Sequence, residues 1–245
     1  MSFIRNVVTG SGANGVVFGL SGGIDSAVVG ALCVRALGKR KVIAVLMPAS
    51  HTPAQDLKDS RKLAKTWGVR SYEVPIDGTF QALTGSLPMG PDSKIANANS
   101  KARIRMTILY YFANSLGMLV VGTGDKSEET IGYFTKWGDG GVDFLPIAHL
   151  YKTQVRQLGA HLGLPPHVVT KAASPQLWPG QMATDELPLD YEDLDPVLYL
   201  LFEAKLSSKE VAKRTGVSPR IMGKVMRMHD SSAHKRALPP MLGSR

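Results

Sequence analysis

Two adjacent glycines stand at the centre of residues 19–26, which read Gly-Leu-Ser-Gly-Gly-Ile-Asp-Ser between an apolar run and a helical pattern. The glycine pair lets the backbone turn tightly and point several N–H groups at one spot. Ser21 and Ser26 add hydroxyl donors, and the N-terminus of the expected helix adds partial positive charge. The string therefore predicts a cradle for an anion of the size of pyrophosphate.

Asp25 lies inside this cradle, where a carboxylate would repel a phosphate. The conflict disappears if Asp25 holds a magnesium ion that bridges it to the phosphates. The loop differs from the phosphate loop of γ-phosphate enzymes, because no lysine follows its glycines. The alternative is a glycine-rich turn in which Asp25 and the serines only cap the helix.

The surrounding sequence alternates between short apolar runs and helical patterns, and most of the runs are followed closely by glycine or proline. We expect strands at 16–20, 42–47, 71–76 and 118–121, and helices over 27–37, 56–67, 102–116 and 152–162. Strands that are apolar throughout indicate an α/β fold, a doubly wound parallel sheet flanked by helices. Ligands of such sheets bind at the C-terminal ends of the strands, which is where the glycine string lies.

The second half is less regular. Residues 137–141 are too rich in glycine for a regular element and predict a loop. Residues 174–195 combine prolines with six carboxylates and predict an exposed, largely irregular excursion. A helix over 208–215, a turn at 216–218 and a helix from Pro219 complete a helical C-terminal segment. We expect one domain over 1–245, with a nucleotide-binding core (1–150) and a substrate-closing part (151–245).

The composition is that of an ordinary globular protein, with 245 residues, 44% hydrophobic and 20% charged. The apolar runs are far shorter than the ~18 residues of a membrane helix, and the N-terminus has no signal-peptide pattern. Cys33 is the single cysteine, which excludes an internal disulfide framework and multi-cysteine metal sites. We therefore expect a cytoplasmic protein that does not bind membranes.

The net charge of +9 is concentrated at the C-terminal end, since residues 203–245 alone carry +7. A basic segment with a helix–turn–helix pattern raises the alternative of DNA binding. The helices are short, however, and the segment ends in the string His-Lys-Arg at 234–236. We favour an attractor for polyanionic substrates, or a surface for dimer packing, and expect no nucleic-acid partner.

Residues 19–26 resemble the pyrophosphate loop of the N-type ATP pyrophosphatases, which adenylate an oxygen atom and release pyrophosphate. Two longer stretches, 121–129 and 132–143, are similar to the signature of the ammonia-dependent NAD synthetase family. Further similarity lies at 99–106, 146–152, 177–181, 185–187 and 234–236. The resemblance implies an adenine nucleotide alpha hydrolase-like, Rossmann-like fold.

The resemblance also implies a reaction, the final step of NAD biosynthesis. A ligase of this family joins ammonia to deamido-NAD through an adenylate, consumes ATP, and releases AMP and pyrophosphate. Glutamine-dependent relatives carry a separate amidase domain with a catalytic cysteine, whereas Cys33 lies in an expected core helix. The implied cofactor is Mg²⁺, and the implied assembly is a homodimer.

Carried onto this chain, the resemblance implies a set of ATP-binding residues: Gly19, Leu20, Ser21, Gly22, Gly23, Ile24, Asp25, Ser26, Met47, Gln55, Thr123, Lys152 and Ser174. Asp25 and Glu128 would hold the metal, while Lys152 and Ser174 would act in catalysis. Ser174 stands where the family commonly has threonine. Two alternatives remain open, because Glu128 could be a solvated charge and Met47 could be a core residue.

The deamido-NAD side is assigned by the same resemblance to Arg103, Tyr133, Phe134, Lys136, Trp137, Asp139, Asp143, His234 and Lys235. Cations suit the diphosphate of the dinucleotide, and aromatic surfaces suit its rings. Trp137 replaces a tyrosine usual in the family. Asp139 is the candidate that binds ammonium and accepts its proton. Its alternative role is to cap the tight glycine turn.

Two rival functions use the same loop. A tRNA-modifying adenylating enzyme would use the basic C-terminus to hold RNA, but would usually need reactive cysteines or an added RNA-binding domain. An ATP-binding module would sense nucleotide without turnover. Pyrophosphate release that requires both deamido-NAD and ammonium distinguishes the ligase from both rivals.

Overall fold

A computed structural model of the chain describes residues 1–88 and 93–242. Four parallel strands form one sheet in the order β3-β2-β1-β4. Their bounds are β1 (Val16–Gly19), β2 (Val42–Leu46), β3 (Arg70–Glu73) and β4 (Leu119–Val120). In the register of the sheet, Val16 lies opposite Val42 on one side and Leu119 on the other. The predicted doubly wound parallel sheet is confirmed.

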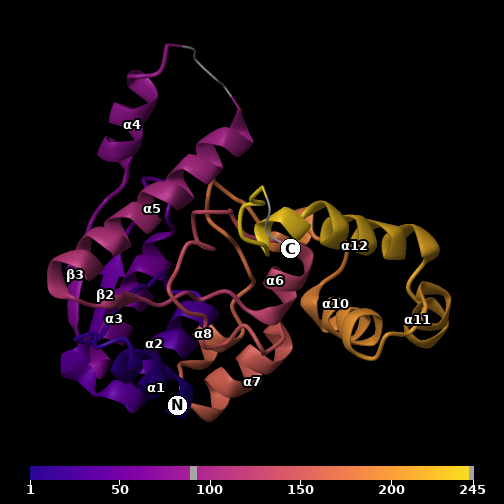
Figure 1. Cartoon of the computed structure of the whole chain (residues 1–245), viewed down its shortest axis with the longest axis horizontal. Coiled ribbons are helices and arrows are strands. Elements are labelled where there is room, and N and C mark those ends of the chain that lie inside the picture. The colour runs from indigo at the N-terminus through magenta and orange to yellow at the C-terminus, as the bar shows by residue number, and fades with distance from the viewer. Residues whose placement is uncertain (89–92, 243–245) are drawn as a thin grey trace.

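Helices surround the sheet and continue beyond it (Figure 1). Their bounds are α1 (Ser2–Gly10), α2 (Ile24–Leu37), η1 (Lys39–Lys41), α3 (Ala54–Trp67), α4 (Asp77–Gly85), α5 (Lys94–Leu116), α6 (Lys126–Ile131), α7 (Lys152–His161), α8 (Pro166–Val169), α9 (Ala183–Glu186), α10 (Tyr191–Leu198), η2 (Tyr199–Glu203), α11 (Ser208–Thr215), α12 (Pro219–Ser231) and η3 (Ala233–Lys235). Of the α-helices, α1, α4, α6, α8, α9 and α10 were not predicted, and α5 begins earlier than expected.

The alternation of side chains along β1 divides the core into two layers. Val16 and Phe18 pack into a cluster with residues of α1, α2, α3 and α7. Val17 points to the other face, where α5 covers it together with Ile43 of β2. β1 and β2 are buried on both faces, which explains their apolar sequences, whereas the edge strand β3 is largely exposed.

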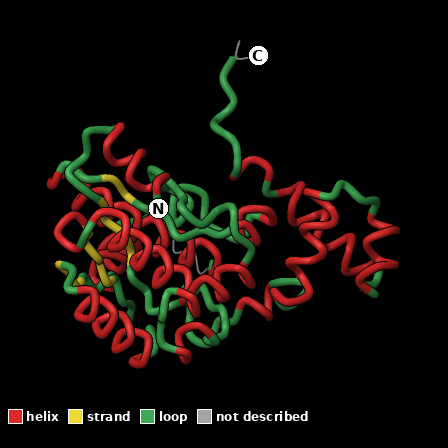
Figure 2. The backbone as a smooth tube through the Cα atoms, turned by 90° about the horizontal axis from the view of Figure 1, so that it is seen from below, coloured by secondary structure: helices red, strands yellow, loops and turns green. Residues whose placement is uncertain are grey.

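A second hydrophobic cluster lies beside the sheet layers and is built by α6, α10, α11 and α12. Its fully buried members are Leu194, Val197, Leu198, Val211 and Val225. These helices form an arm to the right of the sheet in Figure 1, and Figure 2 shows the same arm set apart from the strands. The predicted helices at 208–215 and from Pro219 are confirmed as α11 and α12.

The prediction for residues 174–195 is wrong in one respect. Its first part is irregular, but α9 and the beginning of α10 follow, and Ala183, Leu187, Tyr191 and Leu194 are buried in the second cluster. The apolar residues recur at helical spacing, so one face is buried while the six carboxylates occupy other positions. Among the described residues, no helix is both long and apolar enough to cross a bilayer.

Candidate functional site

The C-terminal edge of the sheet collects the glycine string and the loop after β4. Residues 20–23 connect β1 to α2, with Gly23 as the N-cap of the helix. Gly22 has a φ of +83°, and a Cβ added there would lie 2.4 Å from the carbonyl oxygen of Asp56. Both the left-handed backbone and the close approach of α3 therefore require glycine at this position.

The serines of the string shape the loop by hydrogen bonding. Ser26 Oγ accepts from the Ser21 N–H at 3.2 Å and lies 3.0 Å from the carbonyl oxygen of Gly23, to which it donates. The Ser21 hydroxyl accepts from the Gly23 N–H at 3.3 Å. The loop therefore has a defined curvature at the positive end of α2, as an anion-binding loop needs.

One ammonium group and three carboxylates meet beside this loop. Lys152 Nζ lies 2.8 Å from Asp25 Oδ2, 2.7 Å from Asp125 Oδ2 and 2.9 Å from Glu128 Oε1. Asp25 comes from the first turn of α2, Asp125 and Glu128 from the start of α6, and Lys152 from the start of α7. Three segments that are far apart in the sequence thus share one charged cluster.

Burial perturbs the pKa values of this cluster. Desolvation raises the pKa of Asp125 to about 6, although Lys152 acts in the opposite direction. Desolvation and the neighbouring Asp125 raise the pKa of Glu128 well above its ordinary value. Burial alone would lower the pKa of Lys152, but the three carboxylates outweigh it and hold that pKa high. Lys152 therefore stays a cation in this setting.

Hydrogen bonds to α6 and α10 hold the backbone at the start of α7 in place. Ser127 Oγ accepts from the Lys152 N–H at 3.0 Å and donates to Asp195 Oδ1 at 2.5 Å. The other oxygen of Asp195 accepts from the N–H and the hydroxyl of Thr153, each at 2.8 Å. Since Asp195 belongs to α10, the helical arm anchors the segment that carries Lys152.

The cluster offers ligands for a cation. Oxygen atoms of Asp25, Asp125 and Glu128 lie within 4.8 Å of one another. The second oxygen of Asp25, Oδ1, is buried and has no hydrogen-bond partner among the residues that the structure describes. An unpartnered buried oxygen is costly, and carboxylate oxygens are the ligands that Mg²⁺ prefers. The residues present therefore fit a magnesium ion.

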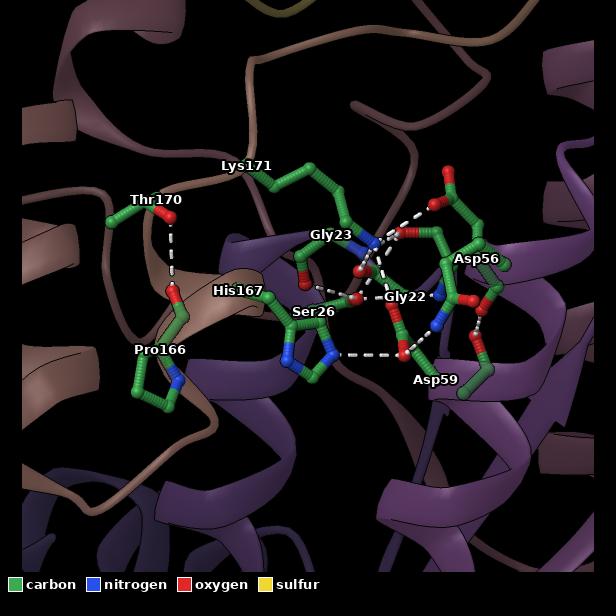
Figure 3. A network of polar contacts seen from close by, with 12 residues as sticks. Gly22, Gly23, Ser26, Asp56, Asp59, Pro166, His167, Thr170 and Lys171 are labelled. Atoms are coloured by element: carbon green, nitrogen blue, oxygen red, sulfur yellow. Dashed lines mark hydrogen bonds and ion pairs between the residues drawn. The ribbon is translucent and has the colours of Figure 1, made fainter.

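A second lysine lies on another side of the glycine loop, as Figure 3 shows. Lys171 Nζ donates to the carbonyl oxygen of Gly22 at 2.9 Å and forms ion pairs with Asp56 at 2.8 Å and Asp59 at 2.9 Å. His167 Nε2 lies 3.0 Å from Asp59 Oδ1. This network ties the loop to α3 and to the segment after α8.

The other expected ATP-side residues lie at the same edge but in different settings. The Met47 side chain approaches Gly19, where a Cβ would lie 3.2 Å from Met47 Cε, and Thr123 is in the loop after β4. The amide of Gln55 donates to Asp59 at 2.8 Å. The Ser174 hydroxyl contacts the carbonyl oxygen of Gln181 and accepts from the Gln176 N–H, so in this structure it organises its own loop.

The residues expected on the dinucleotide side form a second group, in which the loop after α6 meets η3. Lys136 Nζ donates to the carbonyl oxygen of His234 at 2.6 Å, and Arg103 donates to that of Lys136 at 3.3 Å. Lys235 Nζ donates to the carbonyl oxygens of Gly132 and Phe134. The structure therefore brings these segments together, although they are about a hundred residues apart in the sequence.

The aromatic members of this group differ in exposure. Trp137 is half exposed and has a φ of +60°, a strained value for a tryptophan. Tyr133 is partly buried, and its hydroxyl donates to Glu186 Oε1 at 3.0 Å. Trp137 thus presents part of its ring to solvent, with Lys136 Nζ 5.6 Å from the ring centroid, whereas Tyr133 connects the loop to α9.

The two aspartates of the glycine-rich loop have different partners. Asp139 Oδ1 accepts from the Thr135 N–H at 2.9 Å, as the capping role requires. Desolvation by the surrounding protein raises the pKa of Asp139, against backbone hydrogen bonds and Lys235. Asp143 accepts from the Val120 N–H at 2.7 Å and from the Tyr110 hydroxyl at 3.0 Å, so both of its oxygens are engaged. Both residues are exposed, and the raised pKa makes Asp139 the better candidate for a proton acceptor.

Sequence reasoning missed Asp125 and Lys171. Asp125 is an N-cap whose side chain accepts from the Glu128 N–H, while Glu128 reaches back to the Asp125 N–H. The spacing Asp-x-x-Glu is a capping-box pattern, so it could have been recognised in the sequence. Lys171 carries no comparable local pattern, because its partners lie on α3 and in the glycine loop.

Comparisons with known proteins agree with this geometry. The profile of a family described as NAD synthase matches residues 1–239. An NH(3)-dependent NAD(+) synthetase of Hyperthermus butylicus is 49% identical over 239 residues, covering 97% of this chain and 86% of the relative. One of Archaeoglobus fulgidus is 47% identical, covering 98% of this chain and 92% of the relative.

Solved structures give the same result. The NMN synthetase of Francisella tularensis superimposes with a TM-score of 0.87 at 32% identity, covering 99% of this chain and 95% of that one. The NH3-dependent NAD synthetase of Campylobacter jejuni, in complex with the nitrate ion, gives 0.83 at 31% identity, with coverages of 98% and 94%. Because the family model spans nearly the whole chain and these relatives align along most of it, the chain belongs to the NAD synthase family.

Proposed function

We propose that this protein is a ligase that amidates deamido-NAD with ammonia in an ATP-dependent reaction, the final step of NAD biosynthesis. The observation that carries the proposal is the convergence of Lys152 on Asp25, Asp125 and Glu128 beside the glycine loop. This arrangement supplies what the transfer of an adenylyl group needs, namely a cradle for pyrophosphate, a cation site and a buried ammonium group.

The first step joins the nicotinate carboxylate to the α-phosphorus of ATP and releases pyrophosphate. Both reactants are anions, so neutralising their charge is the largest contribution that the protein can make. Asp25 and Glu128 would hold Mg²⁺, which would supply neutralisation of the phosphate charge. Lys152 adds a second positive charge, and the loop 20–23 with the N-terminus of α2 holds the departing pyrophosphate.

The second step is attack of ammonia on the adenylate, with AMP as the leaving group. Ammonium predominates over ammonia at neutral pH, so the site must bind the cation and remove a proton. Asp139 is solvent-accessible and has a raised pKa, which suits a proton acceptor. Cys33 supports ammonia as the nitrogen source, since this only cysteine is buried in α2 and desolvation raises its pKa to about 12.

The relative named NMN synthetase makes a second acceptor worth testing, because amidation of nicotinate mononucleotide would yield NMN by the same chemistry. The half-exposed ring of Trp137 and the cations of the loop–η3 group favour the larger dinucleotide. We also propose a homodimer in the cytoplasm. Light scattering coupled to size-exclusion chromatography tests the assembly.

The deciding experiment is pyrophosphate release from Mg²⁺-ATP by the purified full chain. Deamido-NAD, nicotinate mononucleotide and bulk tRNA are each supplied with and without ammonium. We expect release and NAD formation with deamido-NAD plus ammonium. Release with tRNA alone, or none under any condition, would refute the ligase, and faster turnover of the mononucleotide would reassign the acceptor.

Asp139→Asn separates the two steps. We expect adenylation to continue, because the amide oxygen of the substituted side chain can still accept from the Thr135 N–H and keep the turn. NAD formation should fall by roughly 10²- to 10⁴-fold, the usual contribution of a general base. Rapid-quench measurement of both steps tests this expectation. An equal loss in both steps would show that Asp139 only maintains the loop.

A further inference from the structure

The three carboxylates around Lys152 differ in their access to solvent. The side chains of Asp25 and Glu128 are 24% and 21% exposed, whereas that of Asp125 is 0% exposed and that of Lys152 is 1% exposed. A cation that arrives from solvent therefore meets Asp25 and Glu128 first. Asp125 is buried behind them and is already paired with Lys152, so the arriving cation does not reach it directly.

The charge of the cluster leaves room for a second cation. Three carboxylates and one ammonium carry a formal charge of −2, which a single divalent cation would balance. Removal of Lys152 from the cluster would instead leave its ammonium buried without a partner, at a high cost. Electrostatics thus favours keeping both cations, provided that they occupy different carboxylates.

Lys152 also has little freedom to leave. Its backbone N–H is held by Ser127, and its Nζ lies 5.2 Å from the centroid of the buried Tyr191 ring. The side chain is buried where α6, α7 and α10 meet, and of its three carboxylate partners only Asp125 is itself fully buried.

We propose that burial sorts two cations in this cluster, with Asp125 as a positioning residue for Lys152. The divalent cation binds Asp25 and Glu128, and Lys152 remains paired with Asp125 at the rim of the phosphate site. The inference rests on the proposed function for the presence of a metal, and assigns to Asp125 a role outside the metal's inner ligands.

Manganese titration of the full chain without ATP tests whether the divalent cation binds Asp25 and Glu128 rather than Asp125. Glu128→Gln removes an inner ligand, so Mn²⁺ affinity should fall by more than about 100-fold, whereas Asp125→Asn should cost about 10-fold, as for an outer partner. Asparagine keeps the oxygen that caps α6, which preserves the fold. Equal losses in the two variants would make Asp125 an inner ligand and overturn the proposal, as would the absence of saturable Mn²⁺ binding in the unaltered protein.

Amine labelling followed by peptide mass spectrometry tests whether Lys152 stays paired with Asp125 when the divalent cation is bound. In the unaltered protein Lys152 should resist labelling both with and without Mn²⁺. In Asp125→Asn saturated with Mn²⁺, Lys152 has lost its retained partner, and its labelling should rise clearly above that in the unaltered protein while staying below that of the exposed Lys58. Labelling of Lys152 in the unaltered protein upon Mn²⁺ binding would show simple exchange and overturn the proposal, as would protection in the Mn²⁺-bound variant.

Asp56→Asn is the matched control, because Asp56 is another buried aspartate paired with a lysine beside the same loop. It should change neither Mn²⁺ affinity nor Lys152 labelling. Loss of NAD formation alone would not decide this test, since both readouts are taken without substrates. A failed ligase assay with sorted cations would therefore overturn the proposed function and leave the sorting intact.

Discussion

Two lysine–carboxylate clusters flank the glycine loop, and they differ in how completely their oxygen atoms are paired. Around Lys171, all four carboxylate oxygens of Asp56 and Asp59 have a partner, supplied by the lysine, His167, Gln55 and Gln176. Around Lys152, Asp25 Oδ1 is buried without one among the described residues. Since natural structures pair nearly all buried polar groups, the incomplete cluster marks the place where a ligand is expected.

The difference indicates that the Lys171 cluster supports the folded loop, whereas the Lys152 cluster is suited to bind a cation. The Lys171 cluster balances two carboxylates with a lysine and neutral or weakly basic donors, and it holds the carbonyl of Gly22 in place. The Lys152 cluster retains excess negative charge beside the glycine loop. A cluster of the first kind stabilises the folded protein as it stands, whereas one of the second kind gains its full stability only with a cation bound.

The largest expected effect of this difference is on catalysis. Asp25→Asn should lower pyrophosphate release by roughly 10²- to 10³-fold with the fold intact. The substitution weakens the proposed cation site, so the negative charge that develops on the phosphates is less well neutralised. Asp56→Asn should cause a much smaller loss, acting only through the position of Gly22. Steady-state assays with circular dichroism of both variants measure this. A fully active Asp25→Asn protein would refute the metal role.

The second largest expected effect is on the free energy of unfolding without metal, which should fall more when the Lys152 cluster is altered than when the Lys171 cluster is. Lys152→Met leaves buried carboxylates without a counter-charge and should lower the free energy of unfolding by ~3–5 kcal/mol. Lys171→Met removes hydrogen bonds from groups that keep other donors, which should cost about 1–3 kcal/mol. Urea denaturation in the presence of a chelator gives both values. The exposed Lys58→Met serves as the control, and equal losses at 152 and 171 would contradict the distinction between the clusters.

The smallest effect is the pH dependence of the Lys171 cluster. Desolvation alone would raise the pKa of Asp59, but hydrogen bonds from Lys171, His167 and Gln55 outweigh it and lower that pKa below its ordinary value. A lowered carboxyl pKa stabilises the fold above the unfolded value, and this stabilisation disappears as the pH falls below about 4. The stability difference between the unaltered protein and Asp59→Asn should therefore shrink in that range.

Acid titration of the unfolding free energy of both proteins checks this expectation. Asp193→Asn, which changes an exposed carboxylate, should run parallel to the unaltered protein. A gap for Asp59→Asn that stays constant down to the most acidic conditions would mean that Lys171 does not favour the ionised form.

Much of the fold could be predicted from local patterns. The runs at 16–20 and 42–47 became β1 and β2, and the helix over 208–215 has the predicted bounds, because hydrophobic period and turn residues act over a few neighbours. The arm around Leu194 could not be predicted as a core. Its burial depends on α6, α11 and α12 closing over α10, which are contacts between distant segments.

The candidate site divides in the same way. Asp25, Glu128 and Lys152 were expected from the sequence, and the structure places them together, but their grouping with Asp125 required the fold. Lys171 was missed because no pattern in the sequence around it indicates partners on α3. The pairing of Lys136 and Lys235 with each other's segments likewise depends on α12 returning the chain to the loop after α6.

The sequence by itself determined the glycine loop, its place between strand and helix, and the family to which the chain belongs, because backbone turns and short motifs depend on adjacent residues. Only the tertiary structure decided which carboxylates share Lys152, which oxygen lacks a partner, and how deeply each group is buried. Those properties govern charge and pKa, and they arise where α2, α6 and α7 converge at one edge of the sheet.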